Sequence, residues 1–177
     1  QKLLHILRSG QLVEGLPAIS TAGQILKRRG LVIPPDFTRF HSQAGRLPEM
    51  AWEFYGENLA DVLPAIGTHV PMTEEEIRMM FGAVPRRLFR DHDWRNGLAV
   101  LGTVPSAYVR ELSEGRVDYG IPVQVDTLVA EGKHDLILSI GQVVPHEVIG
   151  MANQSKNVFI GTGGNEVINK THFLGAA

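Results

Sequence analysis

Short apolar runs recur along the chain, and most of them end at glycine, proline or histidine. Runs of four to eight apolar residues bounded by turn formers are typical of buried strands. The run at 135–140 is the clearest. The sequence therefore predicts strands at residues 31–33, 62–66, 98–101, 120–125, 135–140 and 157–160.

Segments with helical spacing of apolar residues separate these runs. The best-marked one begins at Thr73, a good N-cap, with Glu76 three residues later completing a capping box. It is expected to end near Phe81, because Gly82 follows. The other predicted helices cover residues 3–12, 19–29, 47–59 and 127–131, and one more begins at Asn165.

Strands that alternate with helices indicate an α/β fold, here a single domain with a mostly parallel, Rossmann-like sheet and flanking helices. Ligands of such sheets bind beyond the carboxyl ends of the strands. Four strand ends carry ionisable groups or glycines, so we expect them to share one rim. These are residues 36–39, 67–69, 141–146 and 161–164.

Composition narrows the range of functions. Of 177 residues, 44% are hydrophobic and 20% charged, which is typical of a globular protein. A net charge of -2 argues against a nucleic-acid binder. The chain has no cysteine, so any metal must use His, Asp or Glu. We find no run long enough to span a membrane and no signal-peptide pattern, and therefore expect a cytoplasmic protein.

Three side chains near strand ends could carry chemistry, and each also has a plain structural interpretation. His69 and His146 are either catalytic or simply satisfy backbone groups. Lys156 is either a solvated lysine or one held against a ligand by charge or a covalent bond.

Other candidates are weaker on their own. The segment Gly161, Thr162, Gly163, Gly164 is either a tight turn or a phosphate cradle made of backbone N–H groups. His172 lies on the last helix, where it is either a ligand or a helix-face residue. Residues 91–93 (Asp-His-Asp) look metal-like, but three consecutive side chains rarely converge, which favours a turn.

Taken together, these residues resemble the nickel-pincer lactate racemase family. The resemblance rests on Asp36-x-Thr38-Arg39, on the string Gly-Thr-His-x-Pro-Met-Thr-Glu-Glu-Glu at 67–76, and on Pro145-His146 with Lys156 and His172 at their spacings. It covers residues 31–177. It implies the amino-terminal, cofactor-binding domain of a two-domain enzyme whose substrate-covering domain lies outside this chain.

The resemblance also implies a chemistry. The family's cofactor is a nickel-pincer nucleotide, pyridinium-3-thioamide-5-thiocarboxylic acid mononucleotide with Ni. By this resemblance Lys156 carries the cofactor, His172 binds the nickel, and His69 and His146 are the acid/base catalysts. Asp36 lines the cofactor site and Arg39 binds the substrate carboxylate. We add that the glycines of 161–164 suit the cofactor phosphate.

The expected activity is an isomerase, racemising or epimerising a small-molecule 2-hydroxy acid such as lactate or a sugar acid. Residues 150–155 depart from the family's glycine-rich stretch. This departure, with the second domain outside this chain, keeps open one alternative, a non-catalytic ligand-binding domain of the same fold. A separate alternative is a different metal site, such as zinc or iron on His172 with Asp or Glu.

Overall fold

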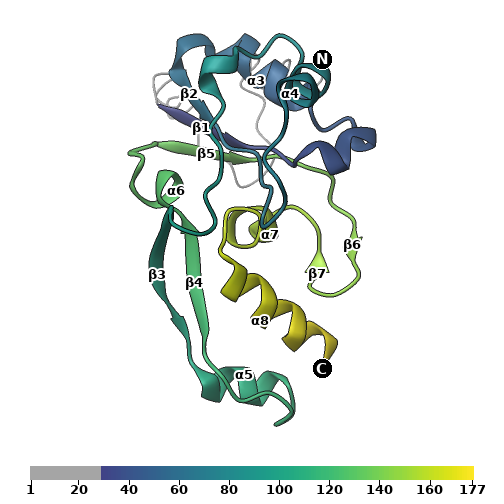
Figure 1. Cartoon of the computed structure of the whole chain (residues 1–177), viewed down its shortest axis with the longest axis vertical. Coiled ribbons are helices and arrows are strands. Elements are labelled where there is room, and N and C mark those ends of the chain that lie inside the picture. The colour runs from purple at the N-terminus through teal and green to yellow at the C-terminus, as the bar shows by residue number, and fades with distance from the viewer. Residues whose placement is uncertain (1–28) are drawn as a thin grey trace, which may run out of the picture.

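A computed structural model describes residues 29–177 of the chain. Its centre is a parallel sheet with the strand order β2-β1-β5, formed by Gly30–Ile33 (β1), Leu59–Val62 (β2) and Leu136–Ser139 (β5) (Figure 1). The other elements are η1 (Phe37–Ser42), α3 (Arg46–Tyr55), η2 (Gly56–Asn58), α4 (Glu74–Phe81), η3 (Arg86–Leu88), β3 (Leu98–Val104), α5 (Ser106–Leu112), β4 (Ile121–Asp126), α6 (Thr127–Glu131), β6 (Pro145–His146), β7 (Gly150–Met151), α7 (Ser155–Phe159) and α8 (Asn165–Ala176).

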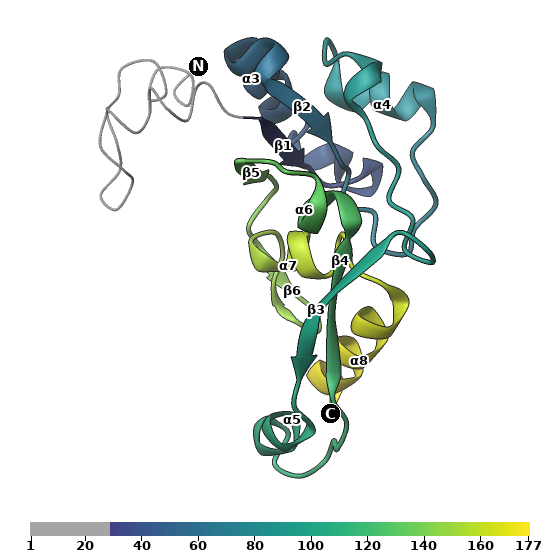
Figure 2. The same ribbon diagram turned by 90° about the vertical axis from the view of Figure 1, so that its left-hand side faces the viewer.

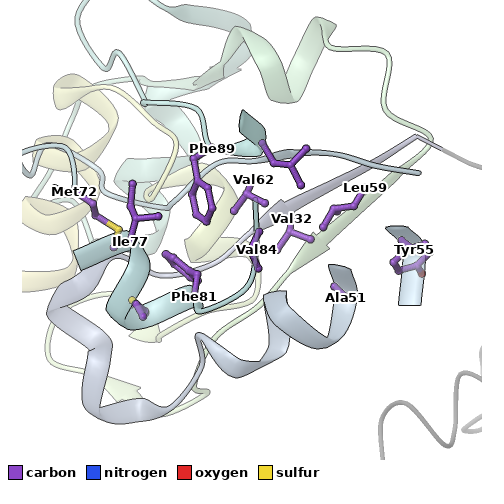
Figure 3. Packing of buried hydrophobic residues seen from close by; sticks show 12 residues of the cluster. Val32, Ala51, Tyr55, Leu59, Val62, Met72, Ile77, Phe81, Val84 and Phe89 are labelled. Carbon is purple, nitrogen blue, oxygen red and sulfur yellow. The ribbon is translucent and has the colours of Figure 1, made fainter. Parts of the chain in front are cut away.

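The central strand β1 is buried on both faces, as its unbroken apolar run predicts. Successive side chains of a strand point to opposite faces. Val32 accordingly joins a cluster with α3 and α4, while Leu31 and Ile33 join a second cluster on the other face. Figure 3 shows Val32 and Val62 beside Phe81 and Phe89 in the first cluster.

The predicted helix at Thr73 is confirmed. Thr73 Oγ1 accepts a hydrogen bond from the Glu76 N–H, and the Glu76 carboxylate accepts one from the Thr73 N–H. Two orphan amides are satisfied reciprocally, and the helix ends at Gly82. The capping box fixes where the chain leaves the sheet rim after His69.

The expected mostly parallel sheet is confirmed for β1, β2 and β5, whereas the runs at 98–101 and 120–125 behave differently. They form β3 and β4, an antiparallel hairpin that extends away from the sheet and carries α5 at its far end (Figure 2). Helix α8 packs along β4 through a third apolar cluster that includes Ile121 and Val167.

The strand predicted at 157–160 is wrong, because these residues lie in helix α7 and its C-cap. A short apolar run does not distinguish a buried strand from a buried helical turn. Here the backbone turns at Gln154, and Asn157 donates its side-chain amide to the carbonyls of Ile33 and Ile140. The run therefore closes over the ends of β1 and β5 and does not pair with them.

The run predicted at 62–66 is displaced, since β2 ends at Val62. The N–H groups of Leu63 and Ala65 still donate to Val32 and Pro34, but Pro34 and Pro35 have no N–H to donate in return. The helices predicted at 3–12 and 19–29 fall outside the described residues, apart from Arg29. Within residues 29–177, every helix is too short or too polar to span a membrane.

Candidate functional site

A cavity of about 180 Å³ opens at the carboxyl ends of the parallel strands. Its walls come from segments that are far apart in the sequence, so the predicted convergence at this rim is confirmed for five candidate side chains. The five are Asp36, Arg39, His69, His146 and Lys156.

Asp36 and His69 form a hydrogen-bonded pair on one wall. Asp36 follows β1 and caps η1, where its Oδ1 accepts the N–H and the hydroxyl of Thr38. Its Oδ2 lies 2.6 Å from Nδ1 of His69. A carboxylate only accepts, so Nδ1 of His69 carries the proton and Nε2 keeps its lone pair.

The backbone around His69 holds this pair in place. Gly67 has φ 56°, a left-handed conformation that favours glycine, and its N–H donates to the carbonyl of Gly161 at 2.8 Å. The His69 N–H donates to Ile66 at 2.9 Å. The side chain of His69 is 60% exposed, although Asp36 beneath it is buried, so its free Nε2 is accessible.

His146, which lines the same cavity, has the other tautomer. Its Nδ1 accepts the N–H groups of Val148 at 3.2 Å and Ile149 at 3.3 Å, which leaves the ring proton of the neutral form on Nε2. The side chain is only 7% exposed. Burial lowers the pKa of His146; the Glu147 carboxylate opposes this, and the nearby Lys156, His172 and Arg39 lower the pKa further. His146 is therefore held neutral.

Arg39 and Lys156 both line the cavity. Neither Arg39 nor Lys156 takes part in the ion pairs formed within residues 29–177. Burial lowers the pKa of Lys156, and Arg39 lowers it further against the opposing charges of Glu147 and Asp36. This favours the neutral, nucleophilic amine.

His172 lies beside the cavity and does not line it. Its ring centroid is 5.8 Å from that of His146, with the two rings nearly perpendicular. Its Nδ1 donates to the carbonyl of Ile168, one helical turn earlier, at 2.7 Å. Nε2 is therefore left with a lone pair, which is the form that binds a metal.

Comparison with known proteins identifies the family. The model for the lactate racemase N-terminal domain matches residues 22–177. The chain belongs to this family.

Two solved structures resemble this lactate racemase-family domain. A protein from Thermotoga maritima is 28% identical, with a TM-score of 0.72 over 93% of this chain and 43% of its own. The lactate racemase apoprotein from Thermoanaerobacterium thermosaccharolyticum is 22% identical, with a TM-score of 0.66 over 93% of this chain and 38% of its own. The chain thus spans less than half of either structure. No curated protein matches it.

In this lactate racemase-family domain the segment 161–164 is not part of the cavity wall. All four residues are buried, and a Cβ on Gly161 would lie 2.5 Å from the Cβ of Ala65 and from the carbonyl of Asn157. A Cβ on Gly164 would lie 2.5 Å from Leu98. Close packing requires these glycines, and the loop does not bring Gly161, Gly163 or Gly164 to the cavity.

Three cavity residues of the lactate racemase-family domain escaped the sequence analysis. Glu147 follows His146 and Asn157 follows Lys156 in the sequence. Neither belongs to a sequence motif that would have marked it as a site residue. Asn153 has φ 60°, and its side chain donates to the carbonyl of Gly141 at 3.0 Å. Asn is among the few residues that tolerate this conformation. Of the three residues, only Asn153 therefore had a residue type that could have indicated a special backbone position.

Proposed function

We propose that this chain is the cofactor-binding domain of a nickel-dependent racemase or epimerase of 2-hydroxy acids. The observation that carries the proposal is that His69 and His146, which line one cavity, have opposite tautomers. One presents a free Nε2 and the other an Nε2–H. Proton transfer at a substrate hydroxyl needs an acceptor and a donor of this kind.

His69 serves as the base for the substrate hydroxyl. Nε2 takes the proton, and Asp36, 2.6 Å from Nδ1, stabilises the imidazolium that results. His146 donates a hydrogen bond from its Nε2–H to the substrate oxygen, and it acts as the acid once it carries a second proton, because only an imidazolium can give up a proton and remain neutral. In the reverse direction neutral His146, with its proton on Nδ1, would be the base, and the imidazolium of His69 would be the acid.

Arg39 binds the substrate through its carboxylate. A guanidinium that forms no ion pair within residues 29–177 suits bidentate binding of a carboxylate, which orients C2 of the substrate within the cavity. A 2-hydroxy acid has this carboxylate beside its hydroxyl. Lactate and the sugar acids both meet the description.

The residues present fit the nickel-pincer nucleotide. Lys156 holds it covalently, through an amine that burial biases toward the neutral form. His172 offers Nε2 to the nickel, with Nδ1 already donated to Ile168. Within residues 29–177, no three His or carboxylate side chains are grouped as metal ligands. When bound, the cofactor supplies a reversible hydride acceptor.

The chain matches only part of each similar structure, which supports the proposal that it is one domain of a larger protein. The match covers 93% of this chain and less than half of either structure, so we place the substrate-covering domain in a further, carboxyl-terminal part of the polypeptide.

Racemisation by cofactor-loaded, full-length variants tests the proposal. Substitutions His69→Ala and His146→Ala should each lower the rate by about 10²–10⁴-fold, because a positioned acid or base contributes about that much. The double variant should lose little more, since the two histidines act as a unit.

The matched control is His41→Ala, which removes an exposed histidine outside the cavity and should leave the rate unchanged. A near-wild-type rate in either single variant would exclude the two-histidine mechanism. Lys156 and His172 would then be cofactor anchors only.

A further inference from the structure

A second histidine–aspartate pair lies outside the cavity, in the interior of the domain. His92 follows η3 and its side chain is 0% exposed. Its Nδ1 is 2.7 Å from Oδ2 of Asp126, and its Nε2 is 3.0 Å from the carbonyl oxygen of Gly163. Neither the cavity wall nor the proposed chemistry uses this pair.

Both ring nitrogens of His92 face acceptors. The other Asp126 oxygen, Oδ1, accepts the Leu128 N–H at 2.8 Å as the N-cap of α6, so this carboxylate is fully engaged as an acceptor. A carbonyl oxygen cannot donate. His92 therefore donates from Nε2 to the Gly163 carbonyl, while Nδ1 is hydrogen-bonded to Asp126.

The carbonyl that His92 binds belongs to the loop between α7 and α8. Three consecutive carbonyls of this loop accept hydrogen bonds from three different parts of the fold. Gly161 accepts from the Gly67 N–H at 2.8 Å, Thr162 from the Asp126 N–H at 2.7 Å, and Gly163 from His92. His92 is the one side-chain donor among the three.

This loop has little room to move. A Cβ on Gly163 would lie 2.2 Å from the carbonyl oxygen of Phe159 and 2.8 Å from Cγ1 of Val167. Helix α7 before the loop carries Lys156, and helix α8 after it carries His172. A shift of the loop therefore changes the placement of Lys156 relative to His172.

We propose that the His92–Asp126 pair holds the α7–α8 loop in place and thereby fixes the position of Lys156 relative to His172. We call this pair the clamp. This proposal rests on the proposed function for the roles of Lys156 and His172. The clamp itself rests only on the hydrogen bonds of His92.

Two substitutions of His92 test its hydrogen bonds to Asp126 and to Gly163 separately. In His92→Asn the amide nitrogen can replace Nδ1 and still donate to Asp126, but it cannot reach Gly163. In His92→Gln the amide nitrogen can replace Nε2 and reach Gly163. The matched control is His134→Asn, which removes another buried pair, between Nε2 of His134 and Asp61 at 2.8 Å, away from the α7–α8 loop.

Hydrogen exchange of the cofactor-free protein gives the first readout. The Asp126 amide, bonded to Thr162, should exchange about 10-fold faster in His92→Asn, because one hydrogen bond changes local opening by about this factor. His92→Gln should change it less. After correction for global stability, His134→Asn should leave it unchanged.

Nickel retention in the loaded, full-length protein gives the second readout. His92→Asn should release nickel to a chelator about 10-fold faster, as for other residues that orient a ligand, while the mass added at Lys156 is unchanged. His92→Gln should retain nickel nearly as well as the wild type.

Equal exchange and equal nickel release in His92→Asn and His134→Asn would overturn the proposal and reduce His92 to a stabilising residue. If the wild type takes up neither adduct nor nickel, the proposed function fails, and the exchange data still decide the clamp.

Discussion

At the scale of single residues, the site depends on which nitrogen of each histidine carries a proton. The sequence places His69 and His146 at strand ends but contains no information on tautomers. Asp36 determines that of His69 through one short hydrogen bond, and two backbone amides determine that of His146. The asymmetry between the two histidines is thus visible only in the folded structure.

The environment of His146 predicts its titration. Burial, together with Lys156, His172 and Arg39, should give it a pKa below the ordinary value of about 6.5. Between that lowered pKa and about 6.5, the unfolded chain binds the proton that the folded chain does not. The contribution of His146 to the free energy of unfolding therefore falls as the pH falls through this window.

An NMR titration of the cofactor-free protein measures this pKa, and His146→Gln assigns the resonance. A midpoint at or above 6.5 would contradict the lowered pKa of His146.

At the scale of elements, helix α7 shows how the site departs from regular backbone geometry. Its N-cap, Gln154, has φ 51° and ψ -133°, and Asn153 before it has φ 60°. A side chain other than glycine is strained in the Gln154 conformation. The strain lies two residues before Lys156, where the chain must turn from the β6–β7 hairpin into the helix.

Gln154→Gly should relieve this strain and stabilise the protein. The expected gain is about 1 kcal/mol, since strain of about 1–3 kcal/mol exceeds the extra entropy that glycine loses on folding, about 0.5–1 kcal/mol. Denaturant unfolding measures the change. The control Gln142→Gly, at an exposed position without a positive φ, should be neutral or destabilising. Equal effects of the two substitutions would show that Gln154 is not strained.

At the scale of the whole molecule, local patterns predicted the elements better than their arrangement. Two of the parallel strands, β1 and β5, and the capped helix at Thr73 follow from apolar runs and capping chemistry, which act over a few residues, whereas β2 lies before its predicted run. The β3–β4 hairpin was not foreseen, because pairing partners depend on contacts between distant segments. The apolar run at 157–160 failed for a related reason, since Asn157 bonds to the ends of β1 and β5.

The site itself was largely predictable. Strand ends of a parallel sheet meet at one rim, so Asp36, Arg39, His69 and His146 could be grouped from the sequence. The glycines of 161–164 could not be assigned correctly, because a phosphate cradle and a tightly packed loop use the same residues. The His92–Asp126 pair was equally hidden, since 34 residues separate its members.

The most direct test of the proposed function is to make two measurements on one sample. The full-length protein is produced together with the enzymes that assemble the nickel-pincer nucleotide, then measured for nickel content and for covalent mass on its peptides. We expect close to one nickel per chain and an adduct on Lys156. His172→Ala should keep the adduct and lose nickel, and Lys156→Arg should lose both. Nickel-free protein without an adduct on Lys156, produced under conditions that load an authentic lactate racemase, would contradict the account.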